Sequence, residues 1–581
     1  MDTQSEQQAQ KQSLVTEARK MVSLFLEAVE TGKQPTKKHE SSLAFSKNSL
    51  KAFASSESIT VEIFRGSGGL RSIVIGVKKH CAESDVVEYG CGALGALTLY
   101  DTSTVIELVK VGAIDSIIMA IATQAEGGTD DALVSALKTL RNLTQTEENR
   151  TTIFKASGIE AVVKAMAANG DYPRTLSHGA LVLSNLAFGN QIIKEAVGNL
   201  GGVAAIAKGM KDHRDFQAMQ ARGSLALRNL CYQSEDNQKV AGENDAAKTL
   251  LATIGAYNDD REVVHQSCVA LANLSSRNEE NRLRIVEAGG VSTLVKLMQT
   301  YTESSTVNDD CISIIRNIAV GSSEAQLEIG LSGGVACICA AMDKFQKSEK
   351  IADKACTALR YLCFLSENRD RIRELQGIEA IINALRRTND SSVVLENALL
   401  AIGNATFGSE ESKAIVGRCG GISAIITAIE QHRLNAGIQE HGCRVLRNLA
   451  DGCELNRRLQ AENGGVNTAV FAMMGYPDNA SVQEQACAML LNMSFSTANL
   501  ERLEHADVHR LAEKAVNLHT KHRGVQLQAG TLLDRLNGYD VTGSGETRAA
   551  VTEHQAPSNN HRRGLRNLFH TSSFRRNARD S

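Results

Sequence analysis

The sequence predicts an all-α, right-handed solenoid of about twelve units, each built from three helices. Three observations lead to this prediction. A motif returns every 43 or 44 residues, a glycine turn keeps the same period, and the composition suits packed helices. Hydrophobic residues make up 43% of the 581 residues, whereas only four are proline, the residue that breaks helices. A repeat array can use this whole length in one locally packed core.

The repeated motif is centred on an asparagine. Leu140–Leu143 reads Leu-Arg-Asn-Leu and returns unchanged as Leu227–Leu230 and Leu446–Leu449. The marker positions are 142, 185, 229, 273, 317, 361, 404, 448 and 492. Weaker copies at Leu97 and Phe53, and one at Leu536, extend the pattern, so the solenoid is predicted between residues 37 and 539.

Glycines form the second landmark. Because glycine adopts left-handed backbone conformations without strain, each is predicted to lie in a turn between two helices. They are Gly158, Gly201, Gly202, Gly289, Gly290, Gly333, Gly334, Gly377, Gly420, Gly421, Gly464 and Gly465. In one repeat, Asn244 and Asp245 stand there instead, and these residue types are the best replacements for glycine.

The unit that begins at Asn278 shows the predicted helices most clearly. A short helix is predicted over residues 279–287, a second over 291–299 and a long third over 307–320. Glutamates in the first turn of the short helix suit the helix dipole. The predicted pattern is therefore a short, a medium and a long helix in every unit.

Period, helix pattern, glycine turn and marker asparagine together make the sequence resemble the armadillo-repeat family, which includes β-catenin and importin-α. The resemblance covers about 500 of the 581 residues. It implies a protein-binding scaffold or adaptor without catalytic activity, whose concave groove holds extended segments of partner proteins. In the family the marker asparagine binds the peptide backbone, and its amide can both donate and accept hydrogen bonds. This role falls on Asn142, Asn185, Asn229, Asn273, Asn317, Asn404, Asn448 and Asn492.

The marker asparagines have an alternative role, which is to tie neighbouring helices together. A second row of residues, seven positions before each marker, lies on the same face of the third helix. Its members are Ser135, His178, Arg222, Gln266, Asp310, Lys354, Asn397, His441 and Gln485. Because all nine are polar, this face is predicted to meet water rather than the core.

Basic residues accompany the markers. Arginines stand directly before five of them, and a lysine and a further arginine stand one turn earlier in two repeats. They are Arg141, Arg228, Arg316, Arg360 and Arg447, with Lys138 and Arg444. Guanidinium groups spaced by a repeat are suited to the acidic or phosphorylated groups of an extended partner. The alternative is that they pair with acids of the adjacent repeat.

Two rival functions within the same fold are a nuclear transport receptor and a regulator of a small GTPase. In importin-α a tryptophan stands four residues before the marker and clamps a basic signal. The chain has no tryptophan, and Lys138 and Arg444 occupy two of those places, which disfavours a basic ligand. A nucleotide-release assay separates the GTPase regulator from the adaptor.

No catalytic residue, metal site or cofactor is predicted, because no nucleotide loop, nucleophile elbow or HExxH motif is present. The net charge of −3 indicates neither a nucleic acid nor a membrane as partner, and no small-molecule substrate is expected. The thirteen cysteines show no zinc-ligand spacing, and most of them are interpreted as reduced core residues. A cytosolic location is expected, with the nucleus as the alternative.

Both ends depart from the repeat. Residues 1–13 are predicted to be disordered, residues 14–36 to form a capping helix, and residues 540–581 to be a disordered tail that is basic from residue 561. The basic part has six arginines and two candidate phosphorylation sites, Ser572 and Ser573. It is a localisation or anionic-surface patch, a pseudo-ligand for the body, or inert.

Deletion of residues 561–581 is expected to change localisation or partner affinity without changing the melting temperature. So short and charged a segment cannot bury enough surface to offset its ordering entropy. Thermal unfolding followed by circular dichroism checks this, and a fall of several degrees would show that the tail belongs to the fold.

Overall fold

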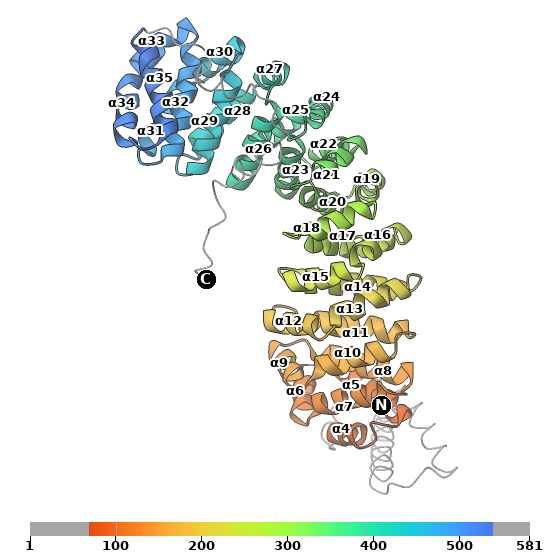
Figure 1. Cartoon of the computed structure of the whole chain (residues 1–581). Coiled ribbons are helices and arrows are strands. Elements are labelled where there is room, and N and C mark those ends of the chain that lie inside the picture. The colour runs from red at the N-terminus through yellow and green to blue at the C-terminus, as the bar shows by residue number, and fades with distance from the viewer. Residues whose placement is uncertain (1–68, 100–101, 389, 539–581) are drawn as a thin grey trace, which may run out of the picture. The chain divides into compact units, whose positions relative to one another are not determined.

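The computed structural model describes residues 69–99, 102–388 and 390–538, and every regular element among them is an α-helix. The all-α prediction is confirmed, with 32 helices, α4 to α35, in the described residues (Figure 1). The copy of the repeat at Phe53, the predicted capping helix and the predicted tail with Ser572 and Ser573 lie outside the described residues.

The helices follow the predicted three-part pattern. The short first helices are α6 (Thr102–Lys110), α9 (Glu147–Lys155), α12 (Gln191–Asn199), α15 (Glu235–Glu243), α18 (Glu279–Glu287), α21 (Ser323–Leu331), α24 (Ser366–Glu374), α27 (Glu410–Arg418), α30 (Glu454–Glu462) and α33 (Thr497–His505). The second helices are α4 (Gly69–Lys79), α7 (Ala113–Gln124), α10 (Gly158–Ala168), α13 (Gly202–Asp212), α16 (Ala246–Ala256), α19 (Gly290–Thr300), α22 (Gly334–Lys344), α25 (Gly377–Arg387), α28 (Gly421–Gln431), α31 (Gly465–Gly475) and α34 (Val508–Leu518).

The long third helices carry the marker positions. They are α5 (Ser84–Leu97), α8 (Asp130–Leu143), α11 (Pro173–Leu186), α14 (Gln217–Cys231), α17 (Arg261–Ser275), α20 (Ser305–Ile318), α23 (Glu349–Leu362), α26 (Ser392–Ala405), α29 (Ala436–Ala450), α32 (Ala480–Ser494) and α35 (Arg523–Leu536). The described residues thus hold ten complete repeats, from α6 to α35, preceded by α4 and α5.

The turn between first and second helices needs its two glycines for different reasons. The first glycine has a left-handed backbone, as Gly289 does with φ 76°. The second is enclosed, because a Cβ on Gly290 would lie 2.6 Å from Cγ2 of Ile285. Asp245 adopts the left-handed conformation with φ 60°, which confirms it as the replacement for glycine.

Polar caps explain where many of these helices begin. Asn278 accepts a hydrogen bond from the backbone N–H of Asn281 at the start of α18, and Ser304 does the same for Val307 in α20. Such a cap contributes about 1 kcal/mol. Glu279 and Glu280 lie in the first turn of α18, where the helix dipole favours acids.

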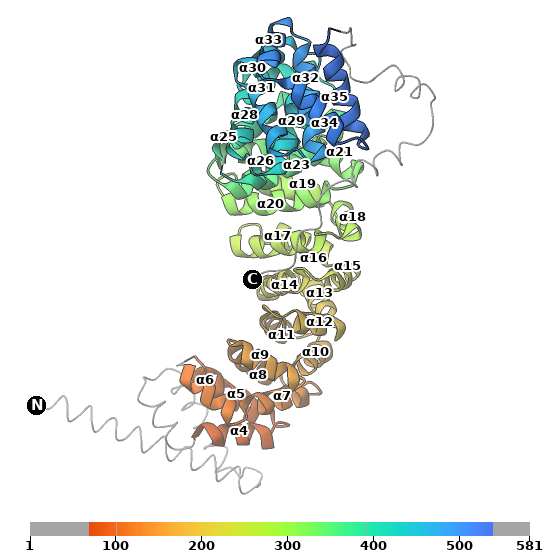
Figure 2. The same cartoon turned by 90° about the vertical axis from the view of Figure 1, so that its left-hand side faces the viewer.

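The chain divides into two compact units, one ending at Gly377 and the other beginning at Ile378. In the first unit each third helix from α5 to α23 packs against the third helix of the next repeat. Figure 2 shows α17 and α20 at one side of this stack and α15 and α18 at the other. In the second unit the same packing joins α26, α29, α32 and α35.

The core between the helices consists mainly of Leu, Ile, Val, Ala, Met and Cys side chains. All thirteen cysteines are free, and nine are buried, which confirms that most of them are core residues. Burial raises the pKa of the Cys91 and Cys443 thiols to about 12, so neither is a ready nucleophile.

No single helix in the described residues is long and apolar enough to cross a membrane. Two bent pairs, α21 with α22 and α27 with α28, reach that length and composition only when each pair is taken together.

Candidate functional site

The marker asparagines lie near the ends of the third helices, and most of them bond to the preceding repeat. Asn273 donates to the carbonyl of Arg228 over 2.8 Å, and Asn492 donates to that of Arg447 over 2.9 Å. The full set of ties runs from Asn142 to Gly95 and Thr98, from Asn185 to Thr144, from Asn229 to Ser184, from Asn273 to Arg228, from Asn317 to Ala272 and Ser275, and from Asn492 to Arg447. Six of the eight asparagines therefore take the alternative role of tying helices together.

In these hydrogen bonds the side-chain amide nitrogen is the donor, so the side-chain oxygen can still accept a hydrogen bond. The side-chain oxygens of Asn185, Asn229, Asn273 and Asn492 receive no hydrogen bond from the described residues. Such an oxygen can accept the backbone N–H of a bound peptide. Peptide binding by the marker asparagines, including the half-buried Asn404 and Asn448, stays a prediction.

Four of the predicted arginines are half-buried and form no ion pair with the described residues. Their guanidinium groups bond only to side-chain amide oxygens. Arg141 donates to Asn142 over 2.8 Å, Arg228 to Gln266 over 2.8 Å, Arg316 to Asn317 over 3.4 Å and Arg447 to Gln485 over 3.3 Å. Pairing with an acid of the adjacent repeat, the alternative for this set, is seen instead at Lys354, which contacts Asp309 over 2.7 Å.

The three remaining basic residues lie close by. Arg360 stacks over the ring of Tyr361, with 5.6 Å between the guanidinium carbon and the ring centroid. Arg444 donates to Nδ1 of His441 over 2.9 Å, and Lys138 is exposed. All the predicted basic residues thus have at least part of their side chain within reach of solvent.

The polar row seven positions before the markers is more enclosed than the sequence predicts. His178, Gln266 and Asp310 are only 6% to 8% exposed, so the prediction that the whole row meets water is wrong for these three. Their neighbours on adjacent third helices cover them and supply polar partners. Nδ1 of His265 lies 2.6 Å from Oδ2 of Asp310, for example. Burial raises the pKa of the Asp310 carboxyl, although the hydrogen bond from His265 opposes this.

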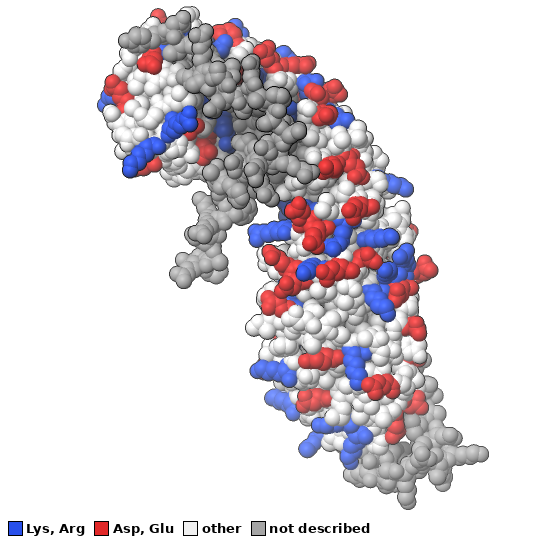
Figure 3. Space-filling view, in the orientation of Figure 1, with Lys and Arg blue, Asp and Glu red and all other residues white. Residues whose placement is uncertain are grey.

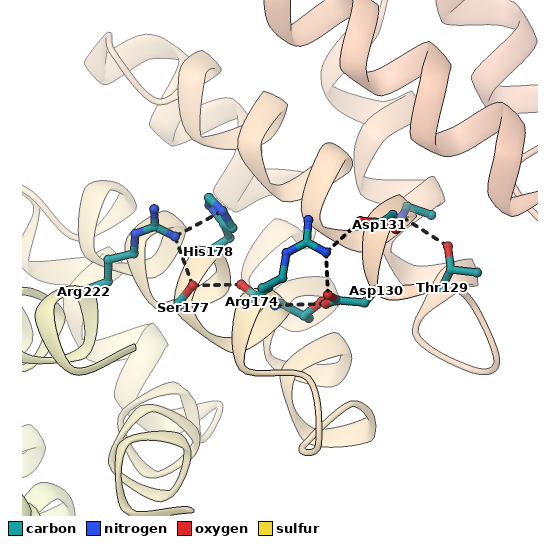
Figure 4. A network of polar contacts seen from close by, with 9 residues as sticks. Thr129, Asp130, Asp131, Arg174, Ser177, His178 and Arg222 are labelled. Carbon is teal, nitrogen blue, oxygen red and sulfur yellow. Dashed lines mark hydrogen bonds and ion pairs between the residues drawn. The ribbon is translucent and has the colours of Figure 1, made fainter. Parts of the chain in front are cut away.

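A group of cations surrounds His178, and we call it the cation cluster: Lys138 and Arg141 on α8, Arg174 on α11, and Arg222 on α14. Figure 4 shows how Arg222 bridges to α11, where its Nη1 donates to Oγ of Ser177 over 3.0 Å and to Nε2 of His178 over 3.1 Å. On the other side, Arg174 is paired with Asp130 and Asp131.

Burial and positive charge both act on His178. Its pKa falls to about 3, first because the ring is buried and then because all four cations repel a further proton. Burial likewise lowers the pKa of Lys138, with repulsion from Arg174, Arg222 and Arg141 as the second cause. The sequence pattern did not single out Arg174, which belongs to neither row.

Sequence reasoning also missed a second, fully buried set of asparagines in the first helices. Asn281 donates to the carbonyls of Gln238 and Leu274 over 2.8 and 3.1 Å, and so joins α18 to α15 and α17. Asn237, Asn368, Asn456 and Asn499 hold the same place. They recur with the period of the markers, which was the signal that could have revealed them.

Four of these five asparagines face a glycine of the preceding repeat, whereas the corresponding residue before Asn499 is Ala461. The pairs are Gly198 with Asn237, Gly242 with Asn281, Gly330 with Asn368, and Gly417 with Asn456. A Cβ on Gly242 would lie 1.9 Å from Oδ1 of Asn281, which leaves no room for a larger residue. The described residues hold no group of three or more His, Cys, Asp or Glu that could bind a metal ion.

Comparison with known families agrees with this anatomy. Residues 278–320 match the family model described as the armadillo/β-catenin-like repeat, and these bounds enclose one unit, α18 to α20. The chain carries armadillo repeats. A second model, described as the LRRK2 ARM repeat, matches residues 333–536 of the armadillo array. The comparison with curated proteins gives no match.

Solved structures share the armadillo fold. A chain from a study of a phosphorylation switch that controls the interaction between cadherin and β-catenin has a TM-score of 0.67 and 16% identity, over 90% of this chain and 96% of that one. An engineered protein has a TM-score of 0.63 and 22% identity, over 73% of this chain and 98% of that one. At these identities the likeness concerns the fold. Armadillo solenoids are generally protein-binding scaffolds rather than enzymes.

Proposed function

We propose that this armadillo protein is an adaptor of the cytosol or nucleus that binds extended acidic or phosphorylated segments of partner proteins along its third helices. One observation carries the proposal. Arg141, Arg228, Arg316 and Arg447 occupy the same position in their repeats, and no described carboxylate neutralises them. An anionic partner gains charge-assisted hydrogen bonds from such groups without first breaking an ion pair.

The surface does not attract every anion equally. Figure 3 shows acidic and basic side chains mixed over the face of the first unit that is turned to the viewer. A long, uniformly negative polymer would therefore meet repulsion as well as attraction. Discrete arginines at one position of the repeat favour a ligand whose charges are also discrete and spaced.

Helix packing gives the expected spacing of those charges. Packed helices lie about 8–10 Å apart, and an extended peptide advances about 3.3 Å per residue. One repeat therefore corresponds to roughly three peptide residues. A partner with an acidic or phosphorylated residue at every third position can place its charges opposite successive repeats.

The test is a triple charge reversal, R316E/R360E/R447E. Affinity for a fluorescein-labelled twelve-residue peptide with Glu at every third position and Gly elsewhere is expected to fall about tenfold or more, because attraction becomes repulsion. Fluorescence anisotropy at 50 and 200 mM salt measures both the affinity and its salt dependence. Circular dichroism is expected to show an unchanged melting temperature, since the three side chains are not in the core.

The matched control reverses three exposed lysines on first and second helices, K155E/K239E/K296E, which changes the net charge equally. Binding should stay close to that of the unmodified protein. Equal losses of affinity in both triple variants would show that net charge alone causes the effect. An unchanged affinity in R316E/R360E/R447E would refute the proposal. Preference for the same peptide with Lys in place of Glu would instead support the transport receptor.

A further inference from the structure

His178 has a hydrogen-bond donor without an acceptor. The residue is 7% exposed, and Nδ1 of its ring is buried with no partner among the described residues. The other ring nitrogen, Nε2, lies 3.1 Å from Nη1 of Arg222. A guanidinium group can only donate, so Nε2 must be the acceptor.

This contact fixes the protonation of the ring. The low pKa of about 3 keeps the imidazole neutral at pH 7, and a neutral imidazole has one N–H. Because Nε2 accepts, the proton is on Nδ1. An N–H that is buried without an acceptor costs free energy, and a ligand that accepts from it recovers that cost.

The charges around His178 indicate what such a ligand is. The four charged groups with the largest electrostatic effect on its pKa are cations, Lys138, Arg141, Arg174 and Arg222. Arg174 is already paired with Asp130 and Asp131, which leaves three cations unpaired. Lys138 makes no hydrogen bond to the described residues, and Arg222 uses only Nη1. Donors from α8, α11 and α14 are therefore left for an anion.

We propose that Lys138, Arg141, Arg222 and Nδ1 of His178 bind a phosphoryl group carried by a phosphorylated segment of a partner protein. A phosphoryl group carries nearly two negative charges and three acceptor oxygens, whereas a carboxylate carries one charge and two oxygens. Three cations and one neutral donor match the former better. This inference rests on the proposed function, since the cation cluster lies on the third helices. It adds that this part of the binding surface is specific for a phosphoryl group.

The binding test uses three fluorescein-labelled octapeptides of Gly and Ser that differ at one central residue: phosphoserine, Glu or Ser. The unmodified protein is expected to bind the phosphoserine peptide at least tenfold more tightly than the Glu peptide, which corresponds to 1.4 kcal/mol. H178F and K138Q should each reduce this preference to less than about threefold, because H178F removes a donor and K138Q removes a positive charge. K138Q changes only an exposed side chain, so its folding is not in question.

The chain supplies matched controls for both substitutions. His441 stands seven residues before its marker, as His178 does, and Lys155 on the first helix α9 is an exposed lysine, as Lys138 is. The surroundings of His441 are not purely cationic, since Glu440 lies 3.9 Å from its ring. H441F and K155Q are therefore expected to keep the tenfold preference.

A spectroscopic measurement tests the donor itself. In protein with 15N-labelled histidine, one Nδ1–H signal should move when inorganic phosphate is added at constant ionic strength, and H178F should remove that signal. In one outcome, peptides bind, but none of the four variants changes the phosphoserine preference and no signal moves. Phosphoryl binding by the cation cluster is then refuted, while the adaptor function stands. If phosphate moves the His178 signal but no acidic or phosphorylated peptide binds, the anion site stands and the adaptor function fails. Absence of both effects overturns both.

Discussion

Replacement of Gly242 by Ala is expected to lower the free energy of unfolding by about 2–3 kcal/mol. The added methyl would lie 1.9 Å from Oδ1 of Asn281 and 2.9 Å from Nη1 of Arg284. Asn281 cannot move aside easily, because it is fully buried and its amide nitrogen bonds to two backbone carbonyls. Urea unfolding followed by circular dichroism measures the change.

Gly255 provides the control in the neighbouring helix α16. A Cβ there meets nothing within 4 Å, and the backbone is helical. Gly255→Ala should be neutral or stabilise the protein by up to about 1 kcal/mol, because Ala loses less backbone entropy in a helix. Similar unfolding curves for the two variants would show that Gly242 is not constrained by its neighbour.

Asn281→Ala is expected to cost about 3 kcal/mol, whereas Asn273→Ala should cost about 1 kcal/mol. Both asparagines tie one repeat to the preceding one. Asn281 is fully buried and serves two carbonyls, so its removal leaves both acceptors without water. Asn273 is half-buried and serves one carbonyl, which solvent can reach after the substitution. The same urea titration compares them.

The double variant Gly242→Ala with Asn281→Ala separates the steric effect from the lost hydrogen bonds. Once the asparagine is replaced, no side-chain oxygen remains to collide with the new methyl, so the combined loss should be smaller than the sum of the single losses. Additive losses would mean that the two residues act independently. A larger loss for Asn273→Ala than for Asn281→Ala would reverse the structural roles given to the two asparagine sets.

The repeat register allowed most of the fold to be predicted from the sequence. The short helix over residues 279–287 was predicted to the residue, and α19 and α20 differ from prediction by one or two residues at each end. Local chemistry suffices there, because capping residues, glycine turns and apolar spacing act within one repeat. Asp245 was identified for the same reason.

Contacts between repeats were harder to predict. Whether a polar side chain on a third helix meets water or the next helix depends on residues about 45 positions away, as for His265 with Asp310. A pattern along one helix does not contain this information. The cation cluster was missed on that ground, since it combines side chains from three repeats and includes Arg174, which follows no sequence row.

The buried asparagines of the first helices have a consequence for how such a chain can change in length. Asn281 bonds to backbone carbonyls, which every residue type has. Its side chain needs space in the preceding repeat, and Gly242 provides this space because it has no side chain. Where Ala325 takes the asparagine's place, the position that corresponds to Gly242 is Val286, so the two requirements disappear together. The joint thus depends mainly on these two positions. Asn499 forms the same pair of bonds after Ala461, although its distance to the carbonyl of Arg457 is longer, at 3.5 Å. Duplication or exchange of whole units can preserve the joint, while the residues exposed on the third helices diversify freely.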